Sequence, residues 1–116
     1  MPIIKHATRP LSEYGDKIRS RGLVTKEDGA NSLTVREVLM EPGSEGRLHT
    51  HPTEQVVMVL GGSIQMILED EVQTLRRGYT LLAPPGVPHA LINNTWVNAS
   101  MLVIDAAQDL ETNFIE

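Results

Sequence analysis

Glycine and proline interrupt this chain so often that the sequence predicts no long helix. Pairs or triplets of these residues stand at 42–43, 61–62 and 84–86, and single ones lie between them. The segments that they separate are short and rich in β-branched residues, as in the run LTVREVLM from 33 to 40. Short strands at close spacing favour an all-β chain that folds as a sandwich or a small barrel.

We expect about nine or ten strands in all, joined by turns. The predicted strands in the larger part of the chain cover residues 33–40, 47–51, 55–60, 63–68, 72–75, 78–83, 90–92 and 97–104. Upstream we expect a strand at 3–7 and another near 21–25. One or two helical turns over 11–18 are an alternative to a strand that starts near 17. The polar stretch after 105 is expected to be a tail or a final edge strand.

Length and composition limit the classes of protein that this chain can belong to. The 116 residues are enough for a core, so we interpret 1–116 as one domain. The net charge is −5 without a block of like charge, so no nucleic-acid partner is expected. Cysteine is absent, which excludes disulfides and thiolate ligands and fits a reducing compartment. No apolar run approaches a membrane span of about 18 residues, and no apolar secretion signal opens the chain, so we expect a cytoplasmic protein without a membrane partner.

Three of the four histidines stand in two short stretches between the predicted turns. His49 and His51 are one residue apart, and side chains at i and i+2 of a strand point to the same face. Gln55 follows with an amide carbonyl oxygen, and His89 comes soon after the turn at 84–86. Three imidazoles and one amide oxygen make a plausible four-ligand site for a divalent transition metal ion.

These two stretches resemble the two sequence motifs of the cupin superfamily, whose members are small jelly-roll β-barrels that hold a metal ion inside. Motif one spans 43–62 and places Gly43, His49, His51, Gln55 and Gly62 at its positions. Motif two spans 78–93 and places Gly78, Pro84, Gly86, His89 and Asn93 at its positions. The resemblance implies an all-β, small jelly-roll (cupin) β-barrel. It also implies one divalent ion, which could be Ni, Zn, Mn or Fe, on the ligands His49, His51, Gln55 and His89.

Gln55 departs from the first motif, which usually has glutamate at this position. A neutral amide leaves the ion more electrophilic and removes a ready general base. Some cupins of this glutamine type act on unsaturated sugar acids. The resemblance therefore implies a Lewis-acid metalloenzyme, similar to an isomerase or lyase, that acts on a small oxygenated metabolite such as a sugar acid. Replacing Gln55 by Glu is then expected to tighten metal binding and to lower turnover.

Two alternative functions stay open. The first is an iron- or manganese-dependent dioxygenase, which needs a redox metal and open positions for oxygen. The second is a module that binds or senses a small ligand without turning it over. All three functions have a small molecule as partner, and a fold alone does not decide between them.

Two further side chains are candidates for contact with a substrate. Strand alternation places Arg47 on the ligand face, where it could pair with a carboxylate; an ion pair at the barrel mouth is the alternative. Trp96 follows motif two and could line a pocket, although a core indole is as common.

The strand at 55–60 is apolar on both faces. We therefore expect a second copy to cover its outward face in a homodimer. Residues 1–20 are expected to form a short helix or a strand exchanged between the two copies.

Overall fold

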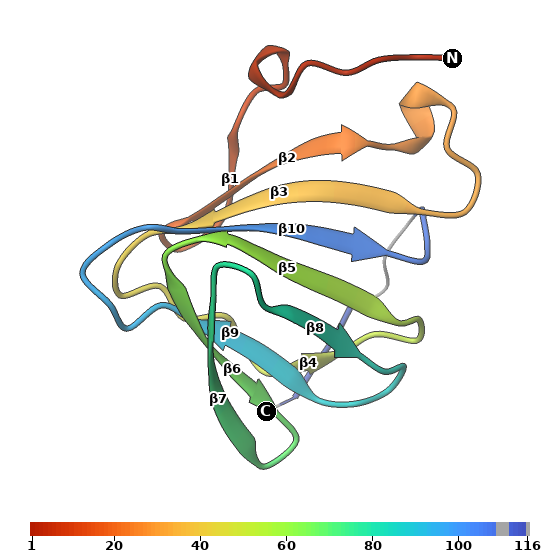
Figure 1. The fold of residues 1–116 in the computed structure, drawn as a ribbon. Coiled ribbons are helices and arrows are strands. Elements are labelled where there is room, and N and C mark those ends of the chain that lie inside the picture. The colour runs from red at the N-terminus through yellow and green to blue at the C-terminus, as the bar shows by residue number, and fades with distance from the viewer. Residues whose placement is uncertain (109–111, 116) are drawn as a thin grey trace.

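The computed structural model describes residues 1–108 and 112–115, which form two antiparallel β-sheets (Figure 1). The larger sheet has the order β1 (Ser12–Gly15), β2 (Ile18–Val24), β3 (Thr34–Met40), β10 (Ala99–Asp105), β5 (Gln55–Gly61) and β8 (Thr80–Ala83). The smaller sheet has the order β11 (Asn113–Phe114), β4 (His49–Thr50), β9 (His89–Ile92), β6 (Ser63–Leu68) and β7 (Glu71–Arg76). This arrangement confirms the predicted all-β jelly-roll barrel.

Helix in the described residues is limited to two single 3-10 turns, η1 (His6–Thr8) and η2 (Lys26–Asp28). Neither turn is long or apolar enough to cross a bilayer, and no other helix is present in that part of the chain. The cytoplasmic location stays a prediction.

The strands predicted between 33 and 104 are confirmed, with ends that shift by a few residues. Two predictions upstream are wrong. Residues 3–7 hold no strand, because no other strand pairs with them, and 11–18 hold no helical turn. The second stretch instead supplies β1 and the start of β2, which form a hairpin around Lys17 with its φ of 60°. A glycine in the middle of this stretch lowers its helix propensity and favours the hairpin.

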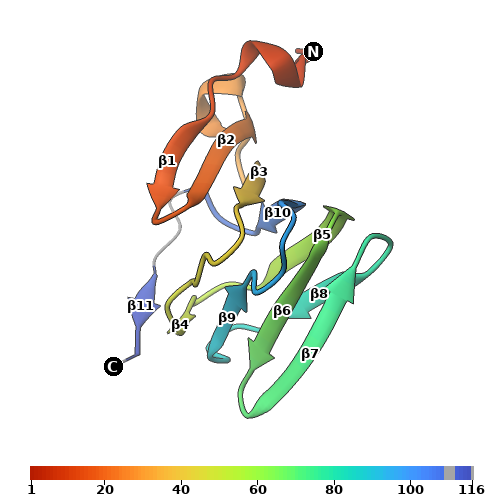
Figure 2. The same cartoon turned by 90° about the vertical axis from the view of Figure 1, so that its left-hand side faces the viewer.

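The two ends of the chain lie beside different sheets (Figure 2). The N-terminal segment leads into β1, which pairs with β2 of the same chain at the edge of the larger sheet. Exchange of this segment between copies stays a prediction. The C-terminal segment supplies β11, which pairs with β4 and confirms a final edge strand. Residues 109–111 of the predicted tail lie outside the described residues.

Strand alternation fixes which side chains enter the space between the sheets. In β10 every second residue is buried, from Ala99 through to Asp105. In β5 the same alternation turns Gln55 inward at the start of the strand. The apolar core consists of Val38, Met40, Val57, Val59, Ile64, Met66, Leu75, Leu81, Ala99, Met101 and Val103. Both sheets contribute to it, so a slip of one residue in any central strand would expose its core side chains.

Candidate metal centre

The two stretches that carry the histidines run side by side in the structure. The backbone N–H of Gly43 donates to the carbonyl of Asn93 at 2.8 Å, which joins the start of the first stretch to the end of the second. The N–H of Gly86 donates to the carbonyl of His51, also at 2.8 Å. The proline-glycine turn before β9 therefore holds the loop that carries His51.

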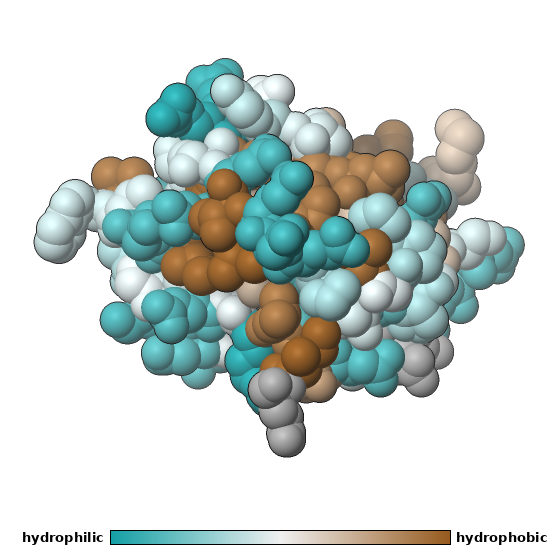
Figure 3. All heavy atoms as spheres, turned by 90° about the horizontal axis from the view of Figure 1, so that it is seen from below, coloured by the Kyte–Doolittle hydropathy of each residue, from teal (hydrophilic) through white to brown (hydrophobic). Residues whose placement is uncertain are grey.

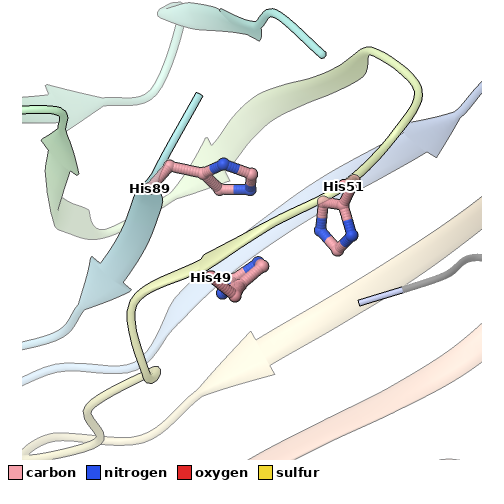
Figure 4. Close-up of side chains that lie close together, drawn as sticks. All are labelled: His49, His51 and His89. Carbon is pink, nitrogen blue, oxygen red and sulfur yellow. The ribbon is translucent and has the colours of Figure 1, made fainter. Parts of the chain in front are cut away.

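Three imidazole rings meet where these stretches lie side by side (Figure 4). His49 in β4 and His89 in β9 are cross-strand partners, and His51 follows β4 directly. Their ligand nitrogens all lie within 4.8 Å of one another. Two ligands of one ion, each at about 2 Å from it, are at most about 4 Å apart, so small ring rotations bring the three nitrogens into range.

The backbone selects which nitrogen of each ring is free to bind a metal ion. The Nδ1 of His49 lies 2.6 Å from the carbonyl oxygen of Arg47, and the Nδ1 of His89 lies 3.0 Å from that of Val87. Because a carbonyl oxygen only accepts, Nδ1 carries the proton in both rings and Nε2 keeps the lone pair. The Nε2 of His89 is buried and makes no hydrogen bond within the described structure. Leaving such an atom unsatisfied is costly, and a metal ion would satisfy it.

The local electrostatics also favour the neutral imidazoles that metals bind. Burial lowers the pKa of His49 below its ordinary value of 6.5, and the neighbouring histidines act in the same direction. Burial likewise lowers the pKa of His89, with His51 adding to the effect. The hydrogen bonds to backbone carbonyls raise both pKa values but do not offset the burial.

Gln55 lines the same cavity as the three histidines. Its Nε2 donates to the Oδ1 of Asp105 at 2.7 Å, so its carbonyl oxygen is the atom left for the cavity. The donor set of His49, His51, His89 and Gln55 therefore fits one divalent ion.

The cavity itself has a volume of about 100 Å³, several times the space that one water needs. Apolar side chains make up much of its wall, and the main ones are Ile18, Val38, Met40, Leu91 and Val103. Tyr14 and Arg36 complete it on the side of β1 and β3.

A model of the family described as Cupin domain matches residues 36–105, well over half of the chain. The chain belongs to the cupin family. This match leaves 1–35 and 106–116 outside it, so the interpretation of 1–116 as one domain stays a prediction. No curated protein matches the sequence of this cupin significantly.

Solved structures resemble this cupin over nearly its whole length. The polyketide cyclase RemF from Streptomyces resistomycificus has 20% sequence identity and a TM-score of 0.92, with 100% of this chain and 86% of that chain covered. A sugar phosphate isomerase from Silicibacter pomeroyi has 21% identity and a TM-score of 0.84, with 99% and 82% covered. KdgF from Halomonas sp. has 17% identity and a TM-score of 0.82, with 94% and 96% covered. At these identities the likeness shows the fold alone.

The structure of this cupin places Arg47 and Trp96 outside the set of residues that line the cavity. Arg47 precedes β4, and since this strand has only two residues, alternation does not extend back to it. Its guanidinium instead lies over the ring of Phe114, 4.1 Å from the centroid. Trp96 lies in the loop between β9 and β10 and is exposed. Substrate contacts by either residue stay predictions.

Three residues without a predicted role lie beside the candidate ligands. Arg36 and Tyr14 line the cavity, with the guanidinium 5.0 Å from the centroid of the Tyr14 ring. Asp105 is buried and contacts both Gln55 and Arg36. Strand alternation could have indicated two of them. Arg36 is an even number of residues from the core residues of β3, and Asp105 is an even number of residues from the core residues of β10, so both point toward the core.

The C-terminal segment also contacts two of the candidate ligands. Phe114 in β11 is the cross-strand partner of His49, and their ring centroids are 6.1 Å apart. The Oγ1 of Thr112 lies 3.4 Å from the Nδ1 of His51. The polar composition of this segment gave no sign of either contact.

Proposed function

We propose that this cupin is a metal-dependent enzyme of the isomerase or lyase type that acts on a small oxygenated molecule. The observation that carries the proposal is the convergence of His49, His51 and His89 in a cavity with apolar walls. A divalent ion such as Zn, Ni, Mn or Fe, when bound there, supplies Lewis-acid polarisation of a carbonyl or hydroxyl oxygen. The apolar walls exclude water and strengthen the polar contacts inside.

The cavity favours a particular kind of substrate. Because apolar side chains dominate its walls, the substrate body that fits is less polar than a fully hydroxylated sugar acid. Arg36 makes one contact with Asp105, at 3.4 Å, and a guanidinium carries several N–H donors. Donors therefore remain for a carboxylate of the substrate. We assign to Arg36 the contact that the sequence predicts for Arg47.

The names of two structural neighbours support this class of reaction. One is called a polyketide cyclase and the other a sugar phosphate isomerase, and these names denote ring closure and isomerisation of a single substrate. Their identity to this chain is too low to transfer either substrate.

Anaerobic turnover is the direct test. The protein is loaded separately with Zn, Ni, Mn or Fe and incubated with carboxylates that carry a carbonyl group beside an exchangeable C–H, and with unsaturated sugar acids. NMR in deuterated water follows deuterium uptake and product formation. We expect oxygen-independent reaction with at least one redox-inert ion, and none with the His89→Ala variant. Turnover only with iron or manganese and oxygen would establish the dioxygenase alternative, and saturable binding without reaction would establish the sensing module.

We also propose that this cupin is a homodimer. Met58 and Leu60 on β5 and Leu82 on the adjacent β8 are exposed on the outer face of the larger sheet. Together they present contiguous apolar surface, which a second copy would cover. Several apolar patches also lie on the lower face of the molecule, with polar side chains between and around them (Figure 3).

A further inference from the structure

Gln55 and Asp105 form a buried polar pair in the wall of the metal centre. They face each other directly on the neighbouring strands β5 and β10. The Nε2 of Gln55 donates to the Oδ1 of Asp105 at 2.7 Å. The exposed fractions of the two residues are 6% and 1%. Water does not compete for this hydrogen bond, so it is strong and directional.

The partner of Gln55 fixes the orientation of its amide group. An ionised carboxylate only accepts hydrogen bonds, so the nitrogen of the amide must face Asp105. The oxygen of the amide is therefore turned away from Asp105, on the side of the cavity that Gln55 shares with the histidines. The Nη2 of Arg36 lies 3.4 Å from the other carboxylate oxygen and supplies the positive charge that a buried carboxylate needs.

We propose that Asp105 is a positioning residue that presents the carbonyl oxygen of Gln55 to the metal ion. This inference rests on the proposed metal site. It also explains why the first motif departs from its usual glutamate: the side chain at 55 must donate an N–H to Asp105 and offer an oxygen lone pair to the ion, and an ionised carboxylate has no N–H or O–H to donate.

The pair changes the result expected for Gln55→Glu. Considered alone, glutamate adds a charged ligand and tightens metal binding. Opposite Asp105, however, it places two carboxylates in contact in a buried site, which repels one of them from its position. An accompanying Asp105→Asn removes this repulsion, because the asparagine Nδ2 can donate to the new carboxylate. The effect of the change at 55 should therefore depend on the residue at 105.

A double-mutant cycle tests this dependence with metal binding and stability as readouts. The four proteins are the parent, Gln55→Glu, Asp105→Asn and the double variant. Zn²⁺ affinity is measured by competition with a chelator at pH 8, and thermal unfolding is measured without metal. We expect Gln55→Glu to unfold at a lower temperature than the parent and to bind Zn²⁺ more weakly. We expect the double variant to recover the unfolding temperature and to bind Zn²⁺ about tenfold more tightly than Gln55→Glu does.

The contrary outcomes separate this inference from the metal site itself. If the two changes act independently on Zn²⁺ affinity, Asp105 does not position Gln55, even where His89→Ala abolishes binding. If the parent and His89→Ala bind Zn²⁺ equally, the metal site is wrong and the inference falls with it. Gln55→Glu alone could fail to fold. In that case, a double variant that folds and binds Zn²⁺ at least as tightly as Asp105→Asn supports the pairing of residues 55 and 105. A double variant that also fails to fold overturns it.

Discussion

At the scale of single residues, the half-buried His49 and the buried His89 predict how the metal-free protein responds to pH. His49 and His89 have pKa values below the ordinary 6.5 because burial disfavours their charged forms. In the unfolded chain both take up protons near that ordinary value. As pH falls below about 6.5, the unfolded state therefore binds more protons than the folded state, and the free energy of unfolding decreases.

Urea unfolding of the metal-free protein between pH 8 and 5 measures this decrease. We expect stability to be highest above about pH 7 and to fall towards pH 5. The variant His89→Gln should show a shallower fall, whereas His6→Gln, which changes an exposed histidine, should keep the profile of the parent. A free energy of unfolding that stays flat to pH 5 in the parent would show that the folded imidazoles are not held neutral.

The two arginines near the site provide the second residue-scale prediction. Arg36 lines the cavity, whereas Arg47 is exposed and lies over Phe114. For a carboxylated substrate we expect Arg36→Gln to raise KM about tenfold or more, and Arg47→Gln to change it little. For the same substrate with an amide in place of its carboxylate, we expect neither variant to raise KM in this way. If Arg47→Gln raises KM for the carboxylated substrate only, Arg47 makes the carboxylate contact, as the sequence predicts.

At the scale of strands and turns, Gly62 connects β5 to β6 with a φ of +72°. An added Cβ there would clash with the carbonyl oxygen of Asn98, whereas Gly78, with a φ of +90°, has open space around it. We expect Gly78→Ala to lower the free energy of unfolding by about 1–2 kcal/mol through backbone strain alone. Gly62→Ala should lower it by about 1–3 kcal/mol more, because the backbone of the loop between β9 and β10 must move. If both variants lose the same free energy of unfolding in urea, the contact between the added Cβ at residue 62 and Asn98 does not destabilise the protein.

Most strands and the meeting of three histidines could be predicted because local rules decide them, whereas metal binding by these histidines and Gln55 stays a prediction. The alternation of apolar and polar residues and the positions of Gly and Pro predicted most strands from 33 onward. The two motifs predicted that His49, His51 and His89 lie close together. The hairpin of β1 and β2 was missed in part because its residues pair at the sheet edge and bury little. Asp105 was missed because a carboxylate at a strand end usually faces solvent, and only the pairing of β10 with β5 shows that it faces Gln55.

At the scale of the whole molecule, the outer face of the larger sheet predicts association. Light scattering at micromolar concentration should give twice the chain mass of 12.8 kDa. Leu82→Asp, on the outer face of β8, should give a monomer, because it places a charge in the apolar contact. Val72→Asp is the matched control, since Val72 is exposed to a similar degree on β7 of the other sheet, 60% against 54%. A parent protein with the mass of one chain would rule out the dimer.

The central claim is that one divalent ion binds where His49, His51 and His89 meet between the two neighbouring histidine stretches. The most direct measurement is elemental analysis of purified protein after loading with Zn²⁺ and removal of unbound metal. We predict one ion per chain in the parent and in His6→Ala, because His6 lies on η1, far in the sequence from the other three histidines. We predict little or none in His89→Ala, which loses a buried ligand nitrogen. The same zinc content in His89→Ala as in the parent would contradict the claim.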